Sequence, residues 1–476
     1  MGLRRNLLGG WILTASSALV LALLVTGSSP SSASTAPHTS SPLTITWLKG
    51  FAAPGTPAKY DKVGVLKIGP RSARNVLVLE PGTSAGSGYF APLAKWIVAR
   101  MPGWQVWSVE RRENLLEDQS EMNLYKAKKI STTKFFNYYL GYLKNPSVTP
   151  HFHPVSNASV AFAKQWGMNV AVQDLHVVIA AAKKLGGKVV LGGHSLGGSI
   201  VTAYATWDFG GHAGADGLAG LVYIDGGSDA TPVSAATATS ELQSLNKSSA
   251  SPWLSFGGII APYAGIFVAT GSATALLDPN SASLGQASGL LPADLVPSVR
   301  VSNVAQFGFA LNVATSPAAL IAAQAHLGTG IASAGPVHGW NGTGAITPIS
   351  RFATMFSGVG VKGADGSEWY FPLRLTDDTG AVADGNPNPA QSVLDVHATM
   401  GRVLPHGLLI YAFAAALGGP GVLTAARALA AQSKIPPGHL TLVDEHTVYA
   451  HNDPAGAYPN SLFFSHLVPF LTKIAP

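Results

Sequence analysis

The sequence predicts an α/β fold in which a mostly parallel sheet is interrupted by one long insertion. Short β-branched or apolar runs alternate with segments of helical periodicity, a pattern typical of parallel strands joined by crossover helices. The alternation stops after residue 225 and resumes near residue 401. With 476 residues, of which 47% are hydrophobic, the chain is long enough for one large core and an insertion.

The chain before the insertion supplies most of the expected sheet. Residues 43–48 and 63–68 have strand-like composition and are separated by turns that contain Pro and Gly. Residues 75–79 (NVLVL) are almost continuously apolar, as expected of a strand that is buried on both faces. The other expected elements here are strands at 104–109, 188–192 and 218–224, helices at 89–101, 135–143, 166–185 and 196–208, and a polar, irregular stretch at 113–165.

The insertion, residues 226–400, is rich in Ala, Gly, Ser and Pro and lacks a regular alternation of strands and helices. We expect it to be largely helical or irregular. Its apolar stretch at 253–277 is broken by Pro262 and several glycines, which favours buried helices over a membrane span. The expected elements after it are strands at 407–413 and 440–443 and helices at 420–433 and 461–474. The predicted core is therefore residues 43–225 together with residues 401–476.

The first 34 residues have the composition of a signal peptide. Arg4 and Arg5 form a positive start, residues 7–26 are uncharged and mostly apolar, and small residues at 32–34 form a cleavage-like site. We therefore expect a secreted protein. The alternative is an uncleaved N-terminal membrane anchor, because the apolar stretch approaches spanning length. The sequence contains no cysteine, so export would not depend on disulfide bonds.

Composition argues against several classes of partner. Only 11% of residues are charged, the net charge is +6, and the basic residues are scattered, which does not favour nucleic-acid binding. His151 and His153 lie in a Pro-containing loop and are too few to indicate a metal site. Neither a Walker-type phosphate loop nor a dinucleotide fingerprint occurs in the sequence. We therefore expect no metal and no cofactor.

The strongest motif is residues 188–198, with the sequence KVVLGGHSLGG. A β-branched run leads into Gly193, Ser195 and Gly197, and a helix-like segment follows at once. This is the strand, sharp turn and helix of a nucleophile elbow, in which small residues on both sides of the serine allow strand and helix to approach. A second G-x-S-x-G occurs at 82–86, so the flanking pattern, and not the pentapeptide, identifies Ser195 as the candidate nucleophile.

A serine nucleophile requires a base that takes its proton, and the base requires a third group that orients it. In open parallel sheets, functional residues collect beyond the carboxyl ends of the strands. His451 lies after the last expected strand and before the last expected helix, which makes it the candidate base. His446, in the same connection, is the alternative.

The candidate acid is Asp225, which directly follows the strand expected at 218–224. The end of the penultimate strand would be the usual place, but residues 412–420 contain no carboxylate. An Asp before two glycines is also an ordinary turn residue. The alternatives for the acid are Glu445, Asp444 and Asp453.

Acyl transfer also requires hydrogen-bond donors for the oxyanion. One expected donor is the backbone N–H of Leu196, the residue after the candidate nucleophile. The second is the backbone N–H of Thr83, in the Gly-rich loop that follows the strand at 75–79.

Together, these residues resemble the α/β-hydrolase superfamily. The resemblance covers the predicted core and not the insertion, and it departs from the family at the missing acid after the penultimate strand. It implies an α/β-hydrolase fold, a cap or lid formed by residues 226–400, and a serine hydrolase that cleaves carboxylic esters through an acyl-enzyme. Some members of the family carry the acid one strand earlier, as Asp225 would be here.

The apolar insertion favours a hydrophobic acyl or alcohol group, so esterase- or lipase-like chemistry on a small or lipid-like ester is the leading interpretation. Transient contact with a lipid surface would fit such a substrate, and the sequence does not predict the oligomeric state. The alternatives are an acyltransferase or a peptidase that uses the same triad. A protein of another class, a non-catalytic surface or binding protein on a hydrolase fold, is favoured by the missing acid.

Overall fold

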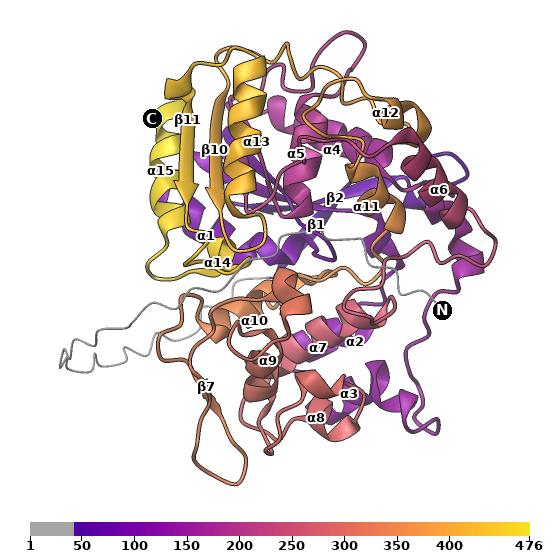
Figure 1. The fold of residues 1–476 in the computed structure, drawn as a ribbon. Coiled ribbons are helices and arrows are strands. Elements are labelled where there is room, and N and C mark those ends of the chain that lie inside the picture. Colours follow the sequence, from indigo (N-terminus) through magenta and orange to yellow (C-terminus); the bar gives the residue numbers. More distant parts are fainter. Residues whose placement is uncertain (1–41) are drawn as a thin grey trace, which may run out of the picture. The chain divides into compact units, whose positions relative to one another are not determined.

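The computed structural model describes residues 42–476, and a nine-stranded sheet lies at its centre (Figure 1). The signal peptide expected at residues 1–34 lies outside the described residues. The strands of this sheet are β1 (Leu43–Lys49), β2 (Lys62–Ile68), β3 (Asn75–Glu80), β4 (Trp104–Glu110), β5 (Val189–His194), β6 (Gly220–Ile224), β9 (Val361–Lys362), β10 (Leu409–Ala414) and β11 (Leu440–Asp444).

The strand order is β11-β10-β6-β5-β3-β4-β2-β1-β9. Strand β2 is antiparallel to both of its neighbours, and the other pairings in this sheet are parallel. The predicted mostly parallel sheet is therefore confirmed. Strands β5, β6 and β10 are buried along their whole length, which explains why their sequences are mostly apolar and do not alternate with polar residues.

Helices cover both faces of the sheet. On one face, α4 (Met168–Lys183), α5 (Leu196–Ala205) and α13 (Gly419–Gln432) bury residues such as Leu175, Ile200 and Leu423 against the strands. On the other face, α1 (Ala91–Arg100) and α15 (Leu462–Ile474) bury residues such as Leu93 and Leu467. The sheet thus separates two apolar cores, and its strand ends are left to position functional side chains.

A second group of helices, which we call the cap, lies below the sheet in the view of Figure 1. The cap helices are α2 (Ser120–Lys126), α3 (Thr132–Tyr139), α7 (Tyr263–Leu277), α8 (Leu284–Ser288), α9 (Asn303–Leu311) and α10 (Ile349–Ser357). A third apolar cluster joins Phe135 and Tyr139 of α3 to Ile266 of α7 and to Trp369. Among the described residues, no helix combines the length and hydropathy needed to cross a bilayer.

The structure divides the chain differently from the sequence-based segments. The cap combines part of the expected insertion with α2 and α3, which come from the polar stretch at 113–165. The rest of the insertion lies on the core, because α6 (Ala235–Leu245), α11 (Leu373–Thr379) and α12 (Pro389–Leu394) contribute to the same apolar cluster as α4 and α5. Residues 42–476 accordingly form one compact unit.

Short elements complete the described chain. A two-stranded sheet pairs β7 (Gly330–Ile331) with β8 (Trp340–Asn341), and α14 (Asp453–Gly456) is a single turn. The 3-10 helices are Ala58–Tyr60, Ser87–Phe90, Arg112–Leu116, Gly141–Leu143, Asn157–Gln165, Ala293–Leu295, Ala318–Ala323 and Pro437–His439.

Candidate active site

The predicted elbow is a sharp turn between β5 and α5. Ser195 occupies it with φ 55° and ψ −127°, a conformation that a residue with a side chain adopts only when its surroundings enforce it. A Cβ on Gly193 would lie 2.2 Å from the carbonyl oxygen of Gly197, and one on Gly197 would lie 2.2 Å from that of Glu80. Glycine at both positions is therefore what allows the helix to begin directly after the strand and Ser195 to sit on the turn.

Asp225 and His451 are in direct contact. The Nδ1 atom of His451 lies 2.6 Å from Oδ2 of Asp225, and each side chain is at most 1% exposed. Burial opposes ionisation of Asp225, but the hydrogen bond and charge of His451 outweigh it and hold the pKa of this carboxyl below its ordinary value. Asp225 is therefore a carboxylate at neutral pH, and it orients the His451 ring.

The end of the penultimate strand, where a carboxylate would be usual, instead supplies donors to Asp225. Oδ1 of Asp225 accepts hydrogen bonds from the backbone N–H groups of Ala415 (2.7 Å) and Gly418 (3.0 Å), and Oδ2 accepts one from Leu417 (3.2 Å). Because β6 lies between β5 and β10, the acid is adjacent to the elbow strand and faces the loop that follows β10. No carboxylate follows β10, and the carboxylate that contacts His451 comes from the end of the neighbouring strand, β6.

Ser195 and His451 line the same cavity, which measures about 60 Å³ and also has Thr83 and Tyr89 in its wall. Within the described chain, the Ser195 hydroxyl has no hydrogen bond recorded, to His451 or to another group. Catalytic hydrogen bonds of this kind are often long without substrate and tighten when it binds. The structure therefore brings the three candidate residues to one site, with the serine hydroxyl free.

The Gly-rich loop after β3 lies directly against the elbow. A Cβ on Gly82 would be 2.8 Å from Cβ of Ser195 and 3.0 Å from the carbonyl oxygen of His194, so only glycine permits this approach. The backbone N–H groups of Thr83 and Leu196 have no protein acceptor in the described part of the chain, whereas the N–H of Ser195 is bonded to the carbonyl of Ile224. Two N–H groups near Ser195 are thus left available.

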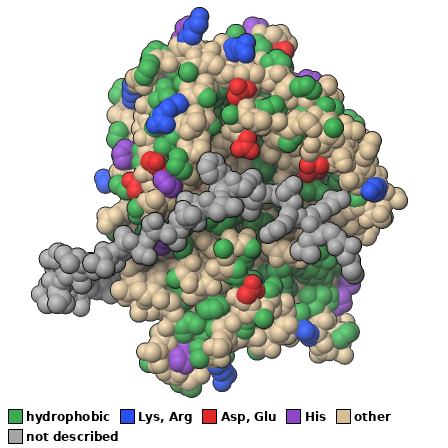
Figure 2. All heavy atoms as spheres, viewed as in Figure 1, with side chains coloured by type: hydrophobic (Ala, Val, Ile, Leu, Met, Phe, Trp, Pro, Cys, Tyr) green, Lys and Arg blue, Asp and Glu red, His purple; other side chains and the backbone are tan. Residues whose placement is uncertain are grey.

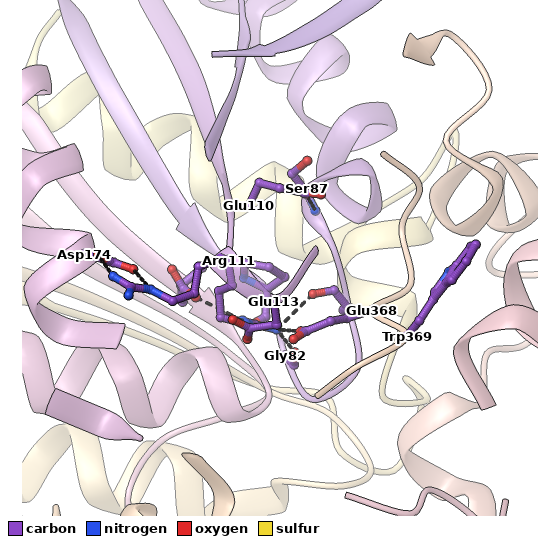
Figure 3. A network of polar contacts seen from close by, with 12 residues as sticks. Gly82, Ser87, Glu110, Arg111, Glu113, Asp174, Glu368 and Trp369 are labelled. Atoms are coloured by element: carbon purple, nitrogen blue, oxygen red, sulfur yellow. Dashed lines mark hydrogen bonds and ion pairs between the residues drawn. The ribbon is translucent and has the colours of Figure 1, made fainter. Parts of the chain in front are cut away.

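Arg111, which sequence reasoning did not single out, holds this loop through its backbone carbonyls. Its guanidinium donates to the backbone carbonyls of Pro81 (2.9 Å), Gly82 (3.0 Å) and Ala85 (3.0 Å). It also forms ion pairs with three buried carboxylates, of which Glu113 and Glu368 are labelled in Figure 3. These partners are Glu80 (3.0 Å), Glu113 (3.2 Å) and Glu368.

The carboxylates around Arg111 are strongly affected by burial. Burial raises the pKa of Glu80 to about 7, although the positive charge of Arg111 acts in the other direction. The pKa of Glu368 is raised as well, again chiefly by burial. The signal that could have located this cluster is the charged run at 110–113 directly after a buried strand, but charged residues at a strand end are ordinarily solvent-exposed.

A second group missed by sequence reasoning surrounds His451. Nε2 of His194 donates to the backbone carbonyl of His451 at 2.9 Å, and the His194 ring stacks on Tyr89 at a centroid distance of 5.0 Å. The Tyr89 hydroxyl donates to Oδ1 of Asn452 at 2.9 Å. Burial and the neighbouring His451 lower the pKa of His194 to about 3, so its ring is neutral and serves to hold the His451 backbone in place.

The alternative site residues are engaged elsewhere. His446 pairs with Asp444 at 2.6 Å, but both side chains are more than a third exposed. Asp453 is buried and accepts hydrogen bonds from His326 and from Thr347, both outside the catalytic constellation. No side-chain hydrogen bond is recorded for Glu445 within residues 42–476. The rings of His151 and His153 lie 4.4 Å apart, and the described residues contain no group of three or more metal-ligating side chains.

On the face shown in Figure 2, Lys and Arg side chains are scattered singly among polar and apolar ones.

No family model and no curated protein sequence matches this chain. A putative lipase from Sulfolobus solfataricus is similar in structure, with 12% identity over 90% of this chain and 92% of that one and a TM-score of 0.44. An esterase from Thermogutta terrifontis is 11% identical over 91% and 99% of the two chains, with a TM-score of 0.37. A monoglyceride lipase variant from Saccharomyces cerevisiae, in complex with a substrate analogue, is 11% identical over 92% and 97%, with a TM-score of 0.37.

These similarities are distant, and the strand order carries the assignment. From β1 to β11 the sheet runs β1-β2-β4-β3-β5-β6-β10-β11, with β2 antiparallel and the sharp serine turn directly after β5. That order, with the serine on an elbow after the central strand, defines the α/β-hydrolase fold. The chain therefore has the α/β-hydrolase fold.

Proposed function

We propose that this protein is a secreted serine hydrolase that cleaves carboxylic esters, with Ser195, His451 and Asp225 as its catalytic triad. The observation that carries the proposal is the buried 2.6 Å contact between Asp225 and His451 at the cavity that Ser195 lines. An oriented histidine beside a serine on a strained turn is the arrangement that activates a hydroxyl for attack on a carbonyl.

The mechanism follows from these positions. His451 Nε2 takes the proton of Ser195 Oγ as Oγ forms a bond to the ester carbonyl carbon, and the backbone N–H groups of Thr83 and Leu196 stabilise the oxyanion. His451 then donates the proton to the alcohol oxygen as the carbon–oxygen bond breaks. Water attacks the resulting acyl-enzyme in the same way, which releases the carboxylic acid and restores Ser195. Asp225 stabilises the imidazolium that forms in both steps.

Hydrolysis of p-nitrophenyl butyrate by the purified mature protein tests this proposal. Ser195→Ala and His451→Ala should each lower kcat by about 10³-fold or more, because a triad acts as a unit. His446→Ala, in the exposed alternative pair, is the matched control and should leave kcat within about twofold of the wild type. Equal loss in the His446 and His451 variants would contradict the assignment.

Secretion, and a covering function for the helices defined above as the cap, are parts of the same proposal. The positive start at Arg4 and Arg5 and the apolar stretch that follows support export. N-terminal sequencing of the protein recovered from culture medium should give a start near residues 33–36. Recovery of the full-length chain from the membrane fraction would favour the uncleaved anchor instead.

A further inference from the structure

The cap contains a second, larger cavity, which we call the cap chamber and which measures about 130 Å³. Its walls come from α3, α7, α8 and α9, with Leu291, Leu295 and the turn at 256–259 closing the remaining sides. That turn is a hairpin whose two central residues, Gly257 and Gly258, both have positive φ. The chamber is thus lined by cap helices together with the segments that connect them.

The cap chamber adjoins the cavity that contains Ser195. The two share five wall residues, which stand between them, and all five are apolar. These shared residues are Phe256, Ala264, Val268, Leu311 and Ala323. A substrate bound at Ser195 would therefore lie next to the chamber, with these apolar side chains between them.

The lining of the chamber suits a hydrocarbon. It contains no ionisable side chain, and its polar groups are turned toward the backbone. Thr270 donates to the carbonyl of Ile266, Asn303 to that of Asp278, and Gln306 to that of Leu295. One acceptor lacks a partner among the described residues: Oε1 of Gln306. A charged or strongly polar ligand group would lose its hydration here without compensation.

We propose that the cap chamber binds the unbranched hydrocarbon chain of the ester substrate while its carbonyl lies at Ser195. The proposal rests on the proposed function and names the substrate class of that site: esters with a medium-length aliphatic chain. The chain enters past Val268 and Leu311 and runs along α7 toward Thr274.

The volume sets the chain length. A dry apolar cavity of about 150 Å³ accepts benzene, so a chamber of this size takes roughly six carbons beyond those next to Ser195. Each methylene that enters the chamber should raise kcat/KM by about fourfold, because its burial is worth about 0.8 kcal/mol. Activity should therefore rise steeply from acetyl to about octanoyl or decanoyl esters and then level off or fall.

Gly271 offers a sharp test, because it lies in the middle of α7 on the chamber wall. A Cβ there would meet only Phe307, at an ordinary contact distance of 3.5 Å. Gly271→Ala is the matched control, since it adds one methyl and increases helix propensity. Gly271→Phe places a ring in the chamber from the same position.

The experiment measures kcat/KM of the wild type and both variants on p-nitrophenyl acetate, butyrate, octanoate and decanoate. In Gly271→Phe, kcat/KM for the acetate ester should stay within about threefold of the wild-type value, and kcat/KM for the octanoate and decanoate esters should fall by about 30-fold or more. Gly271→Ala should have the same kcat/KM values as the wild type on all four esters. A parallel series of acetate esters with lengthening alcohols distinguishes an acyl chain from an alcohol chain in the chamber. The chamber binds the chain of the series in which Gly271→Phe lowers kcat/KM for the longer members.

An unchanged chain-length profile in Gly271→Phe, for both series, would overturn the chamber proposal. That outcome is distinct from failure of the proposed function, in which the wild type would hydrolyse none of the esters and Ser195→Ala would change nothing. Retained acetate hydrolysis in Gly271→Phe also shows that the variant is folded.

An independent inference concerns Arg111. Three of its hydrogen bonds go to the carbonyls of Pro81, Gly82 and Ala85, on both sides of Thr83. The same loop is tied to the segment around Glu368, because the N–H of Glu368 donates to the carbonyl of Ser84 at 3.0 Å. Arg111 thus fixes three carbonyls of a loop in which the N–H groups of Gly82, Thr83 and Ser84 have no protein acceptor in the described structure.

We infer that Arg111 is a positioning residue that aligns the Thr83 N–H with the oxyanion. A planar guanidinium can donate to several carbonyls at fixed angles at once, which an ammonium group cannot do. Arg111→Lys keeps the charge against the three glutamates and loses this geometry. Its effect should therefore appear in the transition state and not in ground-state binding.

Arg112 provides the matched control. It is equally buried, but it pairs with Asp174 at 2.6 Å and Asp61 at 3.0 Å, away from the loop. Arg111→Lys should lower kcat by about 100-fold with KM unchanged, the effect of misplacing one oxyanion donor. Arg112→Lys should lower the melting temperature and leave kcat within about twofold.

The rate of covalent inactivation by a fluorophosphonate is a second readout, because its phosphoryl oxygen occupies the oxyanion position. It should fall in parallel with kcat in Arg111→Lys. A kcat loss that merely matches the unfolded fraction, or an equal loss in Arg112→Lys, would overturn the inference. Glu368→Gln removes one charged partner of Arg111 and spares its contacts with the three carbonyls. It should lower kcat by less than Arg111→Lys does, again without a change in KM. An unchanged kcat in Glu368→Gln would count against the inference.

Discussion

Replacement of Asp225 by Asn tests the triad through the direction of a single hydrogen bond. In the wild type, Oδ1 accepts from the N–H groups of Ala415 and Gly418, and Oδ2 accepts from His451. An Asn side chain has only one oxygen. The two N–H donors require that oxygen on the Oδ1 side, so the amide NH₂ must face Nδ1 of His451.

That orientation forces His451 into the wrong tautomer. Nδ1 must accept from the amide, so the ring proton moves to Nε2, which can no longer take the proton of Ser195. We expect kcat to fall by about 10⁴-fold, equivalent to about 5.5 kcal/mol of transition-state stabilisation. The corresponding Asp-to-Asn change in serine proteases has an effect of this order, and the hydrogen bonds from residues 415 and 418 are the reason to expect it here.

The assay is steady-state hydrolysis of p-nitrophenyl butyrate, with the fold of the variant checked by circular dichroism. Asp444→Asn is the matched control, because Asp444 also contacts a histidine, His446, but at the surface. It should leave kcat within about twofold of the wild type. A folded Asp225→Asn protein with less than a tenfold loss would refute the reasoning.

Further predictions concern stability and its dependence on pH. Burial raises the pKa of Glu110 to about 7. The contribution of protonated Glu110 to the free energy of unfolding is therefore present below about pH 4.5 and is lost as the pH rises through about 7. Glu110→Gln, which stays neutral, should have a free energy of unfolding up to about 3 kcal/mol above that of the wild type at pH 8 and nearly the same at pH 4.5, as measured by urea unfolding at both values. The pKa of Asp225 is lowered instead, so the ionised carboxylate stabilises the folded protein at neutral pH, and this stabilisation is lost as the pH falls below about 4. The melting temperatures of the wild type and of Asp225→Asn should therefore converge in acid. Gly197→Ala should lower the free energy of unfolding by about 3 kcal/mol or prevent folding, because its methyl group would lie 2.2 Å from the carbonyl oxygen of Glu80. Gly421→Ala is the control, because a Cβ there meets no atom within 4 Å. Equal melting temperatures for the two variants would contradict the close approach at the elbow.

Much of the sheet could be predicted from the sequence, because its strands are locally distinctive. Strand β3 is apolar from Val76 to Leu79, and the contact that requires glycine at position 193 comes from Gly197, only four residues away. Asp225 and His451 could be proposed because the carboxyl ends of parallel strands share one edge of the sheet, so chain order alone brings them to the elbow.

The cap and the Arg111 cluster could not be predicted in the same way. Phe135 and Tyr139 pack against α7, which lies more than a hundred residues later in the chain, and no local pattern specifies that partner. Arg111 contacts Glu368 across 257 residues. In the sequence, both partners of that pair look like ordinary exposed charges, and only the tertiary structure shows that they are buried together.

The account depends most directly on Ser195 being an activated nucleophile. Fluorophosphonate labelling of the mature protein, with the modified peptide located by mass spectrometry, measures this without knowledge of the substrate. The account predicts one label, on Ser195 and not on Ser84 of the second G-x-S-x-G sequence, and its loss in His451→Ala. A folded protein that takes no label on Ser195, or labels equally after His451→Ala, would contradict it and favour a binding protein on a hydrolase fold.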